Sequence, residues 1–141
     1  MKRIIYCSQA TIDFSPEELV ALLERSRSNN EACGLSGMLL YCSQSFLQML
    51  EGDEAALQAT YARINADDRH QNLRLLMNTE ITTRLFPDWT MGFEHLDDED
   101  LADELDGYTP ETVHPLVNPD LITNGGVAQT LLTLYGQNRV R

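Results

Sequence analysis

The chain has 141 residues and a formal net charge of −12 at pH 7, from 10 Lys and Arg against 22 Asp and Glu. This charge repels nucleic-acid phosphates and anionic lipid, and no apolar run approaches the ~20 residues of a spanning helix. Cys7, Cys33 and Cys42 form no CxxC pair, which argues against a disulfide framework or a zinc site. We therefore expect one cytoplasmic domain that binds neither nucleic acid nor membrane.

The N-terminal third predicts a strand followed by a helix. Residues 3–8 are apolar and β-branched enough for a strand. Ser15-Pro16-Glu17-Glu18 then combines an N-cap, a first-turn proline and a capping box. The polar run from Arg25 to Asn30 ends the helix, with Gly34 just beyond it. The last turn of this helix therefore presents amide side chains.

The middle of the chain predicts a hairpin and a second helix. Residues 35–41 and 45–51 read as two strands joined by the polar turn Cys42-Ser43-Gln44. Asp53 can cap the helix that follows, which leads into a loop over residues 65–72.

Two more strands, at 73–81 and 90–96, complete the pattern. The order βαββαββ indicates an α+β, ferredoxin-like sheet with both helices on one face. Apolar residues from Val127 to Leu134 predict an amphipathic C-terminal helix that caps the other face. The acidic segment from Asp97 to Asp106 is expected to be a solvated linker.

Gln48 is the least expected residue of the predicted sheet. In strand alternation it shares a face with Phe46 and Leu50, inside the apolar run Phe46–Gly52. A buried carboxamide needs partners, because an unsatisfied polar group costs roughly 1–3 kcal/mol. Backbone groups could satisfy it, in which case its role is structural.

A phenol and three amides are expected to converge near this glutamine. First and third strands of such a sheet lie side by side, so Tyr6 and Gln48 could touch below the amides of Asn29 and Asn30. No carboxylate or lysine is among them, which suits a neutral, planar, hydrogen-bonding ligand better than acid–base hydrolysis. A capped helix end and a core tyrosine are the alternative reading.

Six motifs occur in a fixed order along the chain: Ile5-Tyr6-Cys7-Ser8, Ser26 with Asn29-Asn30, Gly34 to Tyr41, Phe46 to Gly52, Asp68-Arg69-His70 and Trp89-Thr90-Met91. This ordered set resembles the BLUF family, blue-light sensors that use FAD, over roughly residues 2–97. Ser36 stands where the family more often has Thr, and Asn29 where some members have His.

The resemblance implies FAD bound non-covalently between the two helices. Tyr6 and Gln48 would form the photoactive pair, and light would rearrange their hydrogen bonds by rotation or tautomerisation of the Gln48 amide. Trp89 and Met91, expected to share a face of the fifth strand with Phe93, would be switch elements. The cofactor-binding residues would be Tyr6, Ser26, Asn29, Asn30, Gln48, Arg69 and His70.

A photosensor of this short type is not an enzyme, and its output is expected through binding. A sensor domain over residues 1–97 would be followed by an acidic linker and helical cap over 98–141, with a homo-oligomer or an unidentified downstream protein as partner. Two alternatives stay open. A small enzyme of acylphosphatase type would require an arginine in the loop Ser8–Thr11, which has none. A plain protein-interaction module would use the amides structurally.

Overall fold

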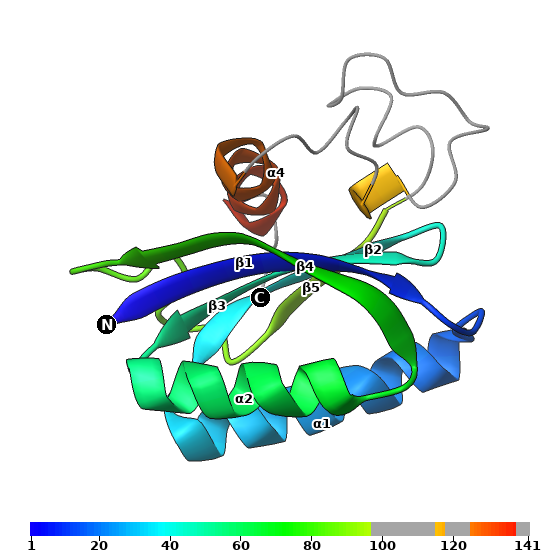
Figure 1. Cartoon of the computed structure of the whole chain (residues 1–141), viewed down its shortest axis with the longest axis horizontal. Helices are drawn as coiled ribbons and strands as arrows, with labels where there is room; N and C mark the ends of the chain where they lie inside the picture. The colour runs from blue at the N-terminus through cyan, green and yellow to red at the C-terminus, as the bar shows by residue number, and fades with distance from the viewer. Residues whose placement is uncertain (97–114, 118–124, 138–141) are drawn as a thin grey trace.

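Strands and helices of the computed structural model form three layers (Figure 1). The structure describes residues 1–96, 115–117 and 125–137. In this part of the chain the elements are β1 Lys2–Ala10, α1 Pro16–Cys33, β2 Ser36–Cys42, β3 Ser45–Gly52, α2 Glu54–Ala66, β4 His70–Glu80, β5 Gly92–His95, the 3₁₀ turn η1 Pro115–Val117 and α4 Gly125–Gln137.

The sheet has the strand order β4-β1-β3-β2-β5 in the described residues. β1 pairs antiparallel with β3 and β4, β2 pairs antiparallel with β3, and β5 joins β2 in parallel. The helices α1 and α2 cover one face, and α4 with η1 covers the other (Figure 1). The predicted ferredoxin-like fold with a C-terminal helical cap is confirmed.

The predicted capping of α1 is confirmed in detail. The Ser15 hydroxyl accepts from the Glu18 amide, and the Glu18 carboxylate accepts from the Ser15 amide, both at 3.1 Å. At the other end Gly34 adopts the left-handed conformation, with φ 72°, and its N–H bonds back to the last turn. These caps fix where α1 begins and ends, and so fix the positions of its amide side chains.

The β2–β3 hairpin turns on two residues, Ser43 and Gln44, whose φ angles are 47° and 60°. Two consecutive left-handed residues match the right-handed twist of the flanking strands. The turn sets the register in which Leu39 lies opposite Gln48.

Some predicted boundaries are wrong. The loop predicted over residues 65–72 is much shorter, because α2 continues to Ala66 and β4 already begins at His70. The fifth strand starts at Gly92 instead of residue 90. Asp53 is the N-cap residue of α2, as predicted, but its side chain makes no cap hydrogen bond. The acidic segment predicted as a linker lies outside the described residues.

Each face of the sheet carries its own apolar core. Ile4, Tyr6 and Leu50 belong to the core under α1 and α2. Residues of alternate positions, such as Ile5 and Met49, pack with η1 and α4. On α4 itself the buried members of this second core are Ala128, Leu131 and Leu132.

α4 begins in direct contact with the sheet. A Cβ on Gly125 would lie 2.5 Å from the Leu76 carbonyl oxygen of β4, which no side chain tolerates. None of the helices in the described part of the chain has the length and apolarity needed to cross a bilayer.

Candidate functional site

Tyr6 and Gln48 are direct register partners on β1 and β3. Residues paired across antiparallel strands project to the same face, so both side chains lie on the face covered by α1 and α2. Tyr6 is 2% exposed and Gln48 is 7% exposed. The predicted juxtaposition of phenol and carboxamide is therefore present.

A cavity of about 590 Å³ lies between these helices and the sheet. A smaller one, of about 80 Å³, continues it toward Tyr6 and His70. The two share six lining residues: Leu22, Ser26, Gln48, Ile64, Asp67 and Arg69. All seven residues predicted to bind a cofactor line one or both of them: Tyr6, Ser26, Asn29, Asn30, Gln48, Arg69 and His70.

The two neighbouring amides of α1 differ in environment. Asn30 is buried, and its Nδ2 donates to the Thr90 carbonyl oxygen at 2.6 Å. Asn29 is half-buried and also lines the larger cavity. The segment before β5 is thus attached to α1 at the edge of the cavity.

Met91 joins this segment to Gln48. The Gln48 Nε2 donates to Met91 Sδ at 3.5 Å, and Arg27 Nε donates to the Met91 carbonyl oxygen at 3.0 Å. Sulfur is a weak acceptor, so the Gln48 amide is held only loosely in this orientation. An amide held this way can exchange one set of partners for another at low cost.

Alternation predicted one strand face for Trp89, Met91 and Phe93, and this is wrong for Trp89 alone, because Met91 and Phe93 both pack with the core under α1 and α2. Trp89 and Met91 both precede β5, and they pack on opposite sides of the sheet. Met91 lies in the core under α1 and α2, whereas Trp89 packs against the core under α4. A Cβ at Gly92 would lie 2.2 Å from the Trp89 ring, which explains why the strand starts with glycine.

Arg69 and His70 reach the cavity from the junction of α2 and β4. The Asp67 carboxylate accepts from Arg69 Nη2 at 2.6 Å and from Arg69 Nε at 3.0 Å. His70 Nδ1 lies 3.0 Å from Ser8 Oγ, and its Nε2 contacts the Ile64 carbonyl oxygen. Only Arg69 lies in the loop, since His70 is the first residue of β4.

Burial keeps the phenol neutral. Desolvation raises the pKa of Tyr6 well above its usual value, and neighbouring Tyr61 raises it further. The two rings meet edge to face, with centroids 5.4 Å apart. By contrast, the side-chain hydrogen bond from Arg69 lowers the pKa of Asp67 to about 2.

The sequence reasoning missed several cavity residues. It placed no carboxylate at this site, yet Asp67 lines both cavities; its position two residues before Arg69 was the available signal. Arg25 and Arg63 line the larger cavity beside Arg69. Three arginines thus gather at one cavity of a chain with net charge −12, which favours an anionic group at its mouth.

The arrangement suits recognition of a planar heteroaromatic ring with an anionic tail. Amide groups offer donors and acceptors to a ring edge, and apolar walls such as Leu22 and Ile64 accommodate its faces. The carboxylate at the site is already paired with Arg69, which leaves it poorly placed as a general base.

The comparison with protein families matches residues 1–92 to the model described as "BLUF: Sensors of blue-light using FAD". Photoactivated adenylate cyclase subunit beta of Euglena gracilis is 33% identical over 99 residues, which are 69% of this chain. The same alignment covers 12% of that relative, so the chain spans a small part of the curated proteins it matches.

Solved structures agree in fold. The dark-state structure of BlrB, a BLUF protein, superposes with a TM-score of 0.65 at 30% identity, covering 72% of this chain and 76% of BlrB. BlsA in its ground state gives a TM-score of 0.79 over 94% of this chain and 87% of BlsA. At 23% identity the likeness to BlsA shows the fold alone.

Proposed function

This chain belongs to the BLUF family, sensors of blue light that use FAD, and on that premise we propose that it signals through rearrangement of the Tyr6–Gln48 hydrogen bonds. The observation that carries the proposal is the register pairing of these two residues beside a cavity enclosed by α1 and α2. Tyr6, Gln48, Trp89 and Met91 are the proposed photoactive residues.

The cavity fits a flavin. Its volume of about 590 Å³ lies within the usual range for cofactor sites, about 300–1,000 Å³. Asn29 and Asn30 would hold the polar edge of the ring. Arg69 and His70 would reach from ring to phosphate end, with Ser26 on the α1 side. The exposed Arg25 and Arg63 add charge that suits a diphosphate.

FAD bound there would supply absorption of blue light and a transient electron acceptor. Tyr6 would give up an electron and its phenolic proton and later recover both. During that interval Gln48 would rotate or tautomerise, exchanging its donor for its acceptor. The product would differ from the dark state in hydrogen bonding alone, and burial of the two side chains would maintain the altered network for a time.

The change would leave the site through Met91. A Gln48 amide that turns away from Sδ loses the 3.5 Å contact, which frees the segment attached to α1 by Asn30 and Arg27. Trp89, two residues earlier, would carry that movement to the core under α4.

BLUF domains act on effector domains or partner proteins, and we propose a homo-oligomer or an unidentified downstream protein for this one. The proposed organisation is a sensor over residues 1–97 and an acidic linker with helical cap over 98–141. A cytoplasmic location is consistent with three free cysteines.

An absorbance spectrum in the dark and after blue light tests the proposal. The purified chain should be yellow, show a small red shift on illumination and return to the dark spectrum. The released flavin should be identified by chromatography as FAD. A flavin-loaded chain without a light-minus-dark difference would overturn the proposal.

A further inference from the structure

Glu51 is a buried carboxylate that the proposed photochemistry does not use. It follows Gln48 by three residues on β3, and because this spacing is odd, it projects to the opposite face, toward α4. Its side chain is fully buried. Arg3, its register partner on β1, donates from Nε to Oε2 at 2.9 Å, and its Nη2 forms an ion pair with the same oxygen at 2.9 Å. A buried charge is tolerated only when it has such partners, and the Glu51 carboxylate has others besides Arg3.

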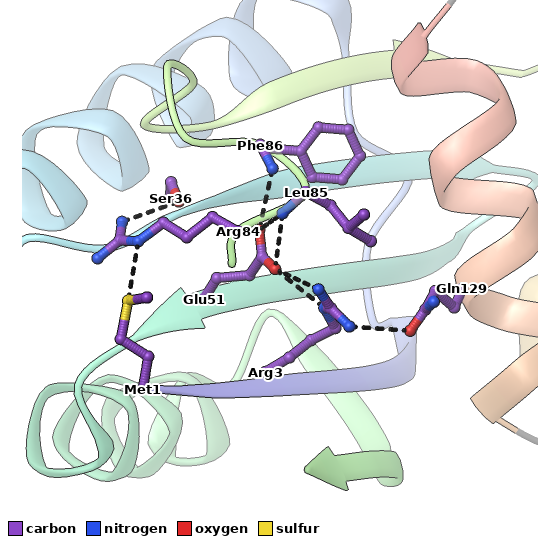
Figure 2. Close-up of polar contacts among 8 residues, drawn as sticks. All are labelled: Met1, Arg3, Ser36, Glu51, Arg84, Leu85, Phe86 and Gln129. Carbon is purple, nitrogen blue, oxygen red and sulfur yellow. Dashed lines mark hydrogen bonds and ion pairs between the residues drawn. The ribbon is translucent and has the colours of Figure 1, made fainter. Parts of the chain in front are cut away.

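The remaining partners of the carboxylate are backbone amides of the segment between β4 and β5. Oε1 accepts from Leu85 N at 2.9 Å and from Phe86 N at 3.0 Å (Figure 2). A carboxylate has about four acceptor sites, so Glu51 is close to saturated. The next residue back, Arg84, donates to Ser36 Oγ and to the Gly34 carbonyl oxygen, which attaches the same segment to β2.

The 84–86 segment leads directly to Trp89 and Met91, the proposed switch residues. Phe86 stacks on Trp89, with ring centroids 5.8 Å apart and planes 14° from parallel. The Trp89 carbonyl oxygen accepts from Gly37 N at 3.0 Å, and Met91 then contacts Gln48. Glu51 thus holds one end of a short segment whose other end contacts the Gln48 amide.

Arg3 extends the contacts to the C-terminal helix. Its Nη1 donates to Gln129 Oε1 of α4 at 3.3 Å, beside the hydrogen bond and the ion pair that the same guanidinium makes with Glu51 (Figure 2). A planar guanidinium can make both sets of bonds at once, which a lysine ammonium cannot do in the same geometry. The 84–86 segment and α4 are therefore connected through the Glu51–Arg3 pair.

We propose that Glu51 is a positioning residue that couples residues 84–91, which lead to Met91, to α4 through Arg3 and Gln129. The proposal rests on the photosensor function proposed above and adds the route by which its state reaches the C-terminal helix. When the Gln48–Met91 contact changes, the 84–86 segment shifts against Glu51, and Arg3 changes its hold on Gln129. Coupling is reciprocal, so loosening Gln129 changes the relative stability of the dark and lit states.

Two variants remove the contact between Arg3 and Gln129 of α4 without leaving the buried Glu51 carboxylate unpaired. Gln129→Leu removes the acceptor of Arg3, and Arg3→Lys keeps the charge beside Glu51 but loses the fork. Thr130→Val on the next residue of α4 is the matched control, since the Thr130 hydroxyl bonds only within the helix, to the Gly126 carbonyl oxygen, among the contacts described. Glu51→Gln is a poor first test because it can unfold the protein.

The experiment measures the dark recovery rate of the red-shifted state at matched flavin occupancy, together with hydrogen exchange of residues 125–137 in dark and light. Gln129→Leu and Arg3→Lys should each change the rate about twofold to tenfold, the range that one net hydrogen bond gives. The double variant should do no more than the larger single change, because each change already removes the Arg3–Gln129 contact. Thr130→Val should recover at the parental rate.

The coupling would be overturned if both variants recovered at the parental rate and if light changed hydrogen exchange in α4 as much as in the parent. That result would leave the photosensor function intact. A parent chain that binds FAD but shows no red shift would instead overturn the photosensor function, and the coupling with it.

Discussion

Replacing Gln48 by Leu should separate switching from stability. The wild-type amide is 7% exposed and donates to a sulfur atom at 3.5 Å. A net hydrogen bond contributes about 0.5–1.5 kcal/mol, and one to sulfur belongs at the lower end. Leu nearly matches Gln in size and is favoured by burial, so the free energy of unfolding should change by less than about 1.5 kcal/mol.

Switching should respond very differently. Leu has neither donor nor acceptor and cannot form either of the two hydrogen-bond patterns that the mechanism requires. At equal flavin occupancy, the light-minus-dark spectrum of Gln48→Leu should therefore show no red-shifted state. Urea unfolding monitored by circular dichroism measures the stability, and flavin fluorescence on release measures the occupancy.

Leu47→Met is the matched control for this experiment. Leu47 is a fully buried neighbour on the same strand but belongs to the core on the α4 side. A volume-conserving change there should cost less than about 1.5 kcal/mol and leave the red shift in place. A normal red shift in Gln48→Leu would refute the assigned role. Loss of more than about 3 kcal/mol in that variant would show that the glutamine is mainly structural.

Three further predictions follow from the same geometry. Tyr6→Phe should retain flavin and lose the red-shifted state, because Phe fills the volume without a phenolic proton; a normal difference spectrum at matched occupancy would contradict it. Met91→Ala should keep the red shift while its infrared backbone difference bands shrink, and bands of parental size would remove Met91 from the output route. Asp67→Asn should cost about 1 kcal/mol at pH 7, because the pair with Arg69 is partly exposed. The folded-state pKa of Asp67 is lowered from 3.8 to about 2, so its contribution is complete above 3.8 and disappears as the pH falls toward 2; a stability gap between parent and variant that persists unchanged to pH 2 would contradict this.

The sequence predicted those features that depend on interactions between residues close together in the chain. The capping box at Ser15 and Glu18 and the left-handed Gly34 set the ends of α1 through bonds within a few residues. Alternation in β3 correctly put Gln48 on an apolar face, and the order of elements predicted that β1 and β3 are neighbours. Together these two signals predict that Tyr6 and Gln48 are neighbours, as the structure shows.

The errors arose where tertiary contacts override alternation. Period-two reasoning put Trp89 and Met91 on one strand face, but the backbone there is attached through Thr90 to Asn30 and through Trp89 to Gly37. Those bonds come from residues more than 50 positions away, and no local pattern encodes them. Asp67 had a local signal, its position two residues before Arg69, but its place at the site depends on the cavity between α1 and α2.

The register of β1 with β3 connects the two faces of the sheet. One alignment pairs Tyr6 with Gln48 on the cavity face and Arg3 with Glu51 on the α4 face. A slip of β3 by one residue would move the side chains of Gln48 and Glu51 to the opposite face. It would also leave the Glu51 carboxylate without the Arg3 guanidinium that compensates its burial. The buried ion pair therefore excludes the alternative alignment at one end of the ladder, and the phenol and the carboxamide are held opposite each other three residues along as a consequence.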